Sequence, residues 1–150
     1  MLPKKTILIK FLVSVGMIFA PAMCVAETAF DRAAAGPRGI IGQPEASCEA
    51  NPFTITFSEN EQRAHFLWRH KIQGYDDQWT NEANYTVLAS DQSTITMVLD
   101  HENRRQPNGD LVEWVLHILP NENVCWKPTH RPDGPCFAEA RQCKIPSPVS

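Results

Sequence analysis

The sequence predicts an all-β domain, an antiparallel meander that forms a small barrel or a strongly curved sheet and is stapled by two disulfides. Three observations lead to this prediction. Apolar and polar residues alternate in runs near residues 53–57, 64–68, 85–89 and 94–99, which is typical of half-buried strands. Polar turn segments arrive every 8–15 residues. Four cysteines remain after the predicted removal of a signal peptide, and an even number in an exported chain indicates disulfides.

Residues 1–26 have the features of a signal peptide. Lys4, Lys5 and Lys10 border an apolar run over 11–20, and the segment ends in Cys24-Val25-Ala26, which offers small residues for cleavage. The apolar run is too short for a permanent membrane helix, which needs about 20 residues. We therefore expect a periplasmic or secreted protein with no stable membrane insertion after cleavage.

The remaining 124 residues are predicted to fold as one domain with two irregular ends. Residues 27–47 are rich in Ala, Gly and Pro and have no lasting apolar period, so we expect a flexible N-terminal arm. Residues 48–127 form the predicted barrel domain. Residues 128–150 contain five prolines and two cysteines, which predicts a tail tethered by a disulfide.

Charge excludes one class of partner. The predicted signal peptide holds three lysines and no acid, so the mature chain has 11 basic and 17 acidic residues and a net charge of about −6. A chain this acidic lacks the basic surface that binds DNA or RNA. We expect no nucleic-acid partner.

The first half of the barrel domain reads as three strands. Phe53–Phe57 alternates without exception, and the polar segment 58–62 then turns the chain. Ala64, Phe66 and Trp68 share one parity in the second strand. A break at 74–77 precedes the third strand, Tyr85–Ala89, which is rich in β-formers.

The second half adds three more strands. Segment 90–93 turns the chain into Thr94–Leu99. Segment 106–110 contains Pro-Asn-Gly, which predicts a turn because Pro presets φ and Asn-Gly accepts positive φ. The next strand, Leu111–Leu119, follows this turn and ends at Pro120. A short strand, Val124–Trp126, follows. Six strands in sequential hairpins predict a meander whose edges are hidden by curling.

The four cysteines are Cys48, Cys125, Cys136 and Cys143, and they allow three pairings. We favour Cys48 with Cys143 and Cys125 with Cys136, which would attach the arm and the tail to the barrel.

No catalytic or metal-binding pattern is recognisable. The five histidines form no HxH or HxxxH pair, there is no CxxC, and no serine sits in a nucleophile elbow. Asp100 and Glu113 are the one carboxylate pair near facing ends of a hairpin, where acids commonly serve solvation. We therefore expect no enzyme, no cofactor and no metal.

Aromatic residues are the stronger lead to function. Seven large rings are spread over the predicted strands, and on alternating positions they converge on the barrel interior. They form either a solid core or a cup for an apolar ligand. The candidate ligand-binding residues are Phe66, Trp68, His70, Trp79, Tyr85 and Trp114. His70 shares the parity of Trp68, and Trp79 lies in a polar loop, where it either contacts a partner or caps the barrel.

The chain resembles the lipocalin-like group of small exported bacterial β-barrel proteins in the order of its strand segments. These segments are FTITFS, AHFLW, YTVLASDQSTITMVLDHENR and LVEWVLHIL, followed by a Cys-Trp pair. The resemblance covers about half of the chain. It implies a barrel that binds a small apolar molecule or another envelope protein. The same topology is similar to that of small exported β-barrel inhibitors of lysozyme. We expect a non-catalytic binding protein for an apolar ligand; the alternative is a protein-binding inhibitor, immunity factor or envelope accessory protein.

Overall fold

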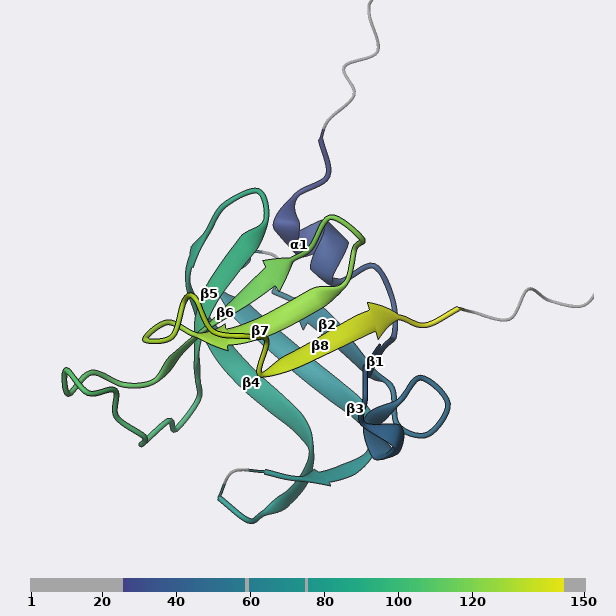
Figure 1. Cartoon of the computed structure of the whole chain (residues 1–150), viewed down its shortest axis with the longest axis horizontal. Helices are drawn as coiled ribbons and strands as arrows, with labels where there is room; N and C mark the ends of the chain where they lie inside the picture. The colour runs from purple at the N-terminus through teal and green to yellow at the C-terminus, as the bar shows by residue number, and fades with distance from the viewer. Residues whose placement is uncertain (1–25, 59, 75, 145–150) are drawn as a thin grey trace, which may run out of the picture.

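Eight antiparallel strands close into a barrel in the computed structural model of the chain (Figure 1). The structure describes residues 26–58, 60–74 and 76–144. Cys48 is bonded to Cys143 and Cys125 to Cys136. The all-β barrel with two disulfides and the favoured pairing are therefore confirmed. The predicted signal peptide lies, apart from Ala26, outside the described residues.

Each strand pairs with its neighbours in the chain, and β1 pairs with β8 to close the barrel. The elements, in order, are α1 (Ala29–Ala33), β1 (Arg38–Ile40), η1 (Pro44–Ala46), β2 (Phe53–Phe57), β3 (Arg63–Gln73), β4 (Trp79–Ser90), β5 (Thr94–Leu99), β6 (Glu113–Ile118), β7 (Val124–Pro128) and β8 (Ala138–Gln142).

The barrel has two strands more than the six that the pattern predicted, and both lie in the segments expected to be irregular. Residues 27–47, expected as a flexible arm, contain α1, β1 and η1. The tail contains β8, whose five residues lie between prolines and include none. β1 has only three residues, too few to show a period, and the apolar residues of β8 are alanines, which give a weak signal. They form because β1 and β8 pair with each other over three residues far apart in the chain.

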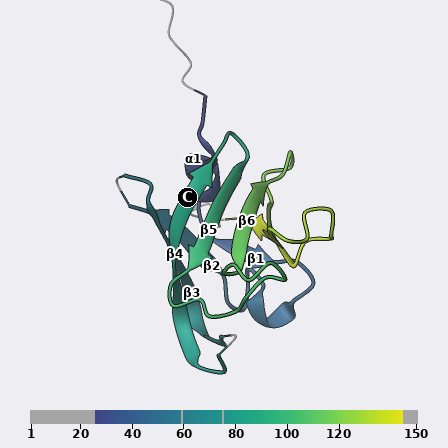
Figure 2. The same ribbon diagram turned by 90° about the vertical axis from the view of Figure 1, so that its left-hand side faces the viewer.

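The two ends of the barrel differ. In a meander, alternate connections lie at the same end. Connections 58–62, 91–93 and 119–123 share one end with α1, which we call the helix end. Connections 41–52, 74–78, 100–112 and 129–137 lie at the other, the loop end. Figure 2 shows α1 above the strands and the β3–β4 hairpin projecting below them.

Helix α1 covers the helix end. Thr28 caps its first turn through a capping box with Asp31: the Asp31 backbone N–H donates to Thr28 Oγ1, and the Thr28 N–H donates to the Asp31 carboxylate. The buried face of the helix includes Ala33 and Phe30, whose ring meets that of Phe57 edge to face at 4.8 Å between centroids. A five-residue helix has little stability of its own, so packing holds it in place.

A buried arginine joins α1 to the barrel. Arg38 lies on β1 with no exposed surface. Its guanidinium donates to three carbonyl oxygens: Arg32 O at 2.6 Å, Ala33 O at 3.2 Å and Glu122 O at 2.9 Å. It therefore caps the carboxyl end of α1 and holds the β6–β7 connection with one side chain.

Gly39 allows a close approach on the outer side of β1. A Cβ atom on this residue would lie 2.2 Å from the backbone nitrogen of Cys48 and 2.7 Å from the carbonyl carbon of Ser47. The segment around Cys48 thus packs directly on the backbone of β1, and the disulfide to Cys143 ties it to the residue that follows β8.

Replacing Arg38 with Met should lower the free energy of unfolding by roughly 3–5 kcal/mol, because one buried and two partly buried carbonyl groups lose their donor. Urea denaturation followed by tryptophan fluorescence measures this. Arg105→Met is the matched control, since Arg105 is exposed and bonds only the neighbouring turn through Gly109 O. A loss below about 1 kcal/mol for Arg38→Met would contradict the role given to this residue.

Replacing Gly39 with Ala should destabilise the protein by about 2–3 kcal/mol, because the added methyl group meets backbone atoms that cannot rotate away. Gly134→Ala is the control, since the nearest atom to its Cβ would be Arg131 O at 3.4 Å. The measurement is the thermal unfolding midpoint of both variants. Equal midpoints would show that the contact at Cys48 yields easily.

Candidate functional site

The barrel interior is packed with aromatic rings. Phe66 is fully buried, and its ring lies 5.1 Å from that of Tyr85 and 5.3 Å from that of Trp126. The ring of Phe53 lies 5.5 Å from that of Trp68. Aromatic pairs at these distances are in contact. The sequence left open whether the rings form a solid core or a cup for a ligand. The rings of β2, β3 and β7 pack on one another as a core does.

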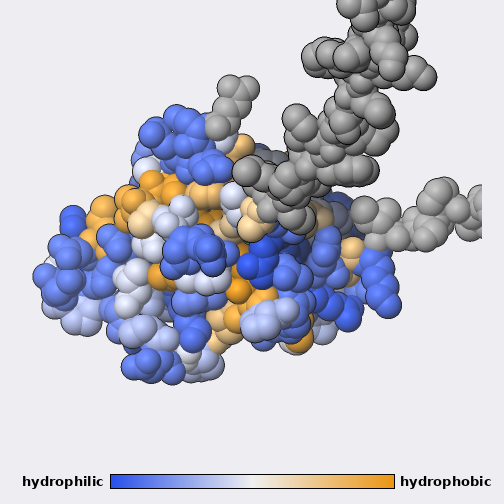
Figure 3. Space-filling model, turned by 90° about the horizontal axis from the view of Figure 1, so that it is seen from above, coloured by the Kyte–Doolittle hydropathy of each residue, from blue (hydrophilic) through white to orange (hydrophobic). Residues whose placement is uncertain are grey.

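Two surface hollows lie outside this core. One is lined by the β1–β2 connection and Arg141, at the loop end. The other lies at the helix end, between Phe30, the 60–62 turn and the last residues of β4. Seen from above, the helix end shows apolar patches between hydrophilic ones (Figure 3). Leu88 is 49% exposed there.

The β3–β4 hairpin extends beyond the barrel. We call this protruding hairpin the arm from here on; it is separate from the N-terminal segment 27–47. β2 pairs with β3 only as far as Trp68, and β5 pairs with β4 only from Tyr85 onward, so the hairpin between them has no neighbouring strand (Figure 1). The register of the arm shifts between Leu67 and Ile72. Trp79 stands at its tip, opposite Gln73, and is 64% exposed.

The base of the arm is held by Asn51. Its Oδ1 accepts from the His70 backbone N–H at 2.7 Å, and its Nδ2 donates to the His70 carbonyl at 3.2 Å. Asn51 itself is buried. The arm therefore leaves the barrel at a defined angle from a hydrogen-bonded base.

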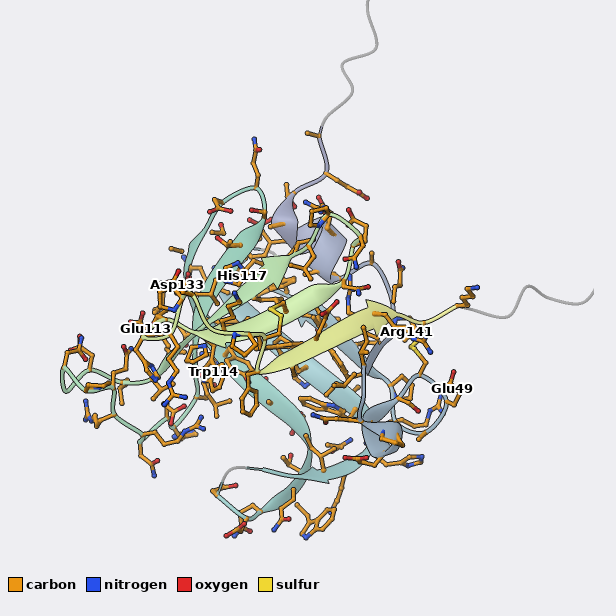
Figure 4. The ribbon with its side chains drawn as sticks, viewed as in Figure 1. Glu49, Glu113, Trp114, His117, Asp133 and Arg141 are labelled. Carbon is orange, nitrogen blue, oxygen red and sulfur yellow. A yellow bond between two sulfur atoms is a disulfide. The ribbon has the colours of Figure 1, made fainter. Side chains whose placement is uncertain are left out.

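The β7–β8 connection presents a second exposed ring. The disulfide between Cys125 and Cys136 closes this proline-rich loop, and Phe137 follows directly with 74% of its surface exposed. The Phe137 backbone N–H donates to Trp126 O at 2.8 Å. Its ring meets that of Trp114 edge to face at 5.4 Å. Figure 4 shows where Trp114 lies at the start of β6.

The β5–β6 connection holds Trp114 from its other side. Arg104 Cζ lies 5.7 Å from the centre of the Trp114 ring, a cation–π distance. Arg104 is positioned by Glu102, whose side chain is fully buried; Nε and Nη2 of Arg104 donate to its two carboxylate oxygens at 2.8 and 2.6 Å. Such bidentate pairs are geometrically specific.

The Glu102 carboxylate is stabilised in its charged form. Burial by itself would raise the pKa of Glu102, but hydrogen bonds from the Arg104 side chain and from the backbone N–H groups of Arg104 and Asn103 outweigh burial and lower it. Glu102 thus organises the 100–112 connection beneath Trp114.

The predicted site residues separate into three places. Phe66, Trp68 and Tyr85 belong to the interior cluster. Trp114 and Trp79 are at the loop end, one on the barrel and one on the arm. His70 is exposed at the arm base and is not part of the interior row, because the register shift after Leu67 breaks its parity with Trp68. Sequence reasoning missed Phe137 and Arg104, although Cys136 marked the loop that ends beside Phe137.

Titratable groups elsewhere are engaged in pairs. Nε2 of His65 lies 3.0 Å from Glu82 Oε2, and Asp100 is paired with Arg63. His117 faces outward on β6; partial burial and the charge of Lys127 lower its pKa, although Asp91 opposes this. Within residues 26–144, as far as they are described, no three His, Cys, Asp or Glu side chains gather to hold a metal ion.

We define the loop-end surface as Trp79, Trp114 and Phe137 with Arg104. Trp79 and Phe137 are exposed and Trp114 is half-buried, and the barrel portion of this surface is held by a disulfide and an ion pair. Disulfides of this kind form in an oxidising environment. No helix of the described part of the chain is long and apolar enough to span a membrane.

Acid should weaken the anchoring of the 100–112 connection. Because the pKa of Glu102 is lowered from its ordinary value of 4.5, its contribution is complete above that value and is lost as the pH falls through the folded-state pKa. The stability difference between the parent and Glu102→Gln should therefore be largest near neutral pH and shrink below pH 4.5. Urea denaturation at several pH values measures it, with Asp110→Asn, an exposed acid of the same connection, as control. A difference independent of pH would contradict the assignment.

Comparison with known proteins identifies no relative: no family model, no curated protein and no solved structure matches this chain. The lipocalin-like resemblance of the segment order accordingly stays a prediction, while the barrel that it implied is present.

Proposed function

We propose that this chain is a non-catalytic binding protein, exported to the periplasm or beyond the cell, that holds another protein at its loop-end surface. The observation that carries the proposal is the exposure of large aromatic side chains at that end: Trp79 is 64% and Phe137 74% exposed. Tryptophan and arginine are the residues most enriched among those that dominate binding energy at protein interfaces.

The shape of the loop end supports a protein partner over a ligand enclosed in the barrel. The interior rings pack on one another, which supports assigning them to stability. The arm carries Trp79 away from the barrel, where the ring can enter a pocket on a partner. The backbone of Phe137 is bonded to Trp126 and its ring contacts Trp114, while Arg104 is held by Glu102, so less side-chain freedom is lost on binding.

A small apolar molecule that reaches Trp68 in the barrel is the second candidate, and one observation favours it. The indole Nε1–H of Trp68 is buried and has no acceptor among the described residues. An unsatisfied buried donor costs about 1–3 kcal/mol, which a ligand with a hydrogen-bond acceptor would recover.

Replacing both Trp79 and Phe137 with Ala should leave the fold intact and weaken capture of the partner at least tenfold, since both rings are exposed and a hot-spot ring is worth about 2 kcal/mol. Affinity capture from an extract of the native host, followed by titration of the purified partner, measures this. Leu88→Ala is the matched control, because Leu88 is exposed but lies at the helix end. Retention of the partner by the double variant would exclude the loop-end surface.

Native mass spectrometry of protein released gently from the same host separates the two candidates. A protein partner adds a mass that dissociates on dilution or denaturation and has a polypeptide size. A small ligand adds a low mass to the intact chain, and its discovery would overturn the preference for a protein partner.

A further inference from the structure

A shallow apolar hollow lies on the outer side of β1 and shares no residue with the loop-end surface. Its volume is about 370 Å³, at the lower end of the roughly 300–1,000 Å³ typical of small-molecule sites. Figure 4 shows Arg141, one of its lining residues, to the right of Trp114, with β7 between their strands β8 and β6. The residues that line it are Ile40, Ile41, Gly42, Gln43, Pro44, Ser47, Cys48 and Arg141.

The walls of this hollow are fixed by the fold. One wall packs on the backbone of Gly39 and is tied to Cys143 by the disulfide of Cys48. The other is joined to β8, where the Ile41 backbone N–H donates to Glu139 O at 2.8 Å. The hollow is thus preformed, which lowers the cost of filling it.

Arg141 is the cation among the residues that line this hollow. Arg141 pairs with Gly39 across the β1–β8 ladder, so its side chain shares the outer face against which Cys48 packs. Its ion-pair partner is Glu49, whose Oε1 lies 3.8 Å from Nη2, beyond ordinary hydrogen-bond length. Both side chains are largely exposed, at 60% and 76%, so a pair of this kind is weak and easily exchanged.

We propose that this hollow binds a medium-chain fatty acid, with the alkyl chain against Ile40, Ile41 and Pro44 and the carboxylate on Arg141. The guanidinium can hold a carboxylate through two parallel hydrogen bonds, and the bound anion would take the place of Glu49. The apolar wall has room for a chain of limited length, because the hollow is small and open to solvent. This site does not depend on the function proposed for the loop-end surface.

Calorimetric titration of the mature protein with decanoate, below its critical micelle concentration, tests the proposal. We expect binding to the parent, a loss of at least tenfold in Arg141→Gln, and a gain of a few fold in Glu49→Gln, which removes the competing carboxylate. Decanol, which has the same chain without the charge, should bind more weakly to the parent and be insensitive to Arg141→Gln.

Two further variants locate the site. Ile41→Ser should weaken decanoate and decanol alike, because it removes apolar wall. The Trp79→Ala, Phe137→Ala double variant should bind decanoate as the parent does. Absence of decanoate binding to the parent, unchanged affinity in Arg141→Gln, or loss of binding in the loop-end double variant would each overturn the proposal.

Discussion

The buried guanidinium of Arg38 is the contact on which the closure of this barrel most depends. β1 has three residues and meets β2 at a single pair, Arg38 with Phe53, so backbone hydrogen bonding alone holds it weakly. The side chain of Arg38 compensates by joining α1 to the β6–β7 connection. Burial lowers the pKa of Arg38 and the Glu122 carboxylate opposes this, and an arginine in such a setting keeps its charge. Glu122 also accepts from Arg32, which adds an ion pair to the same corner.

The two disulfides have different structural roles. Cys48–Cys143 spans 95 residues and clamps β1 between its covering segment and the end of β8. Cys125–Cys136 spans 11 residues and shapes one loop. In the chain-entropy picture each is worth about 3–5 kcal/mol, more for the longer closure. The first closes the fold, whereas the second presents Phe137.

A filled interior moves recognition to the connections. The rings that converge inside the barrel contact one another, so we place recognition at the loop-end surface and in the hollow beside β1. Both are preorganised, the first by Glu102 and a disulfide and the second by Gly39 and the other disulfide. Trp79 and Trp114 were predicted as site residues from the sequence because a tryptophan in a polar segment or on a strand is a candidate contact residue. Phe137 and Arg104 were not, because the position of Phe137 depends on the loop closed by Cys136 and that of Arg104 on its ion pair with the buried Glu102.

The sequence by itself determined the all-β class, the meander order and the bounds of β2 and β5, because period-2 alternation and polar turns are local properties of the chain. It also indicated the disulfide pairing that the structure confirms. Only the tertiary structure decided that β1 and β8 are strands and that α1 caps the barrel. Each is too short to be stable alone and exists through contacts with distant residues, such as Gly39 with Arg141 and Arg38 with Glu122. The tertiary structure also decided which aromatic rings lie in the core and which lie on the surface, since burial is a property of the closed barrel.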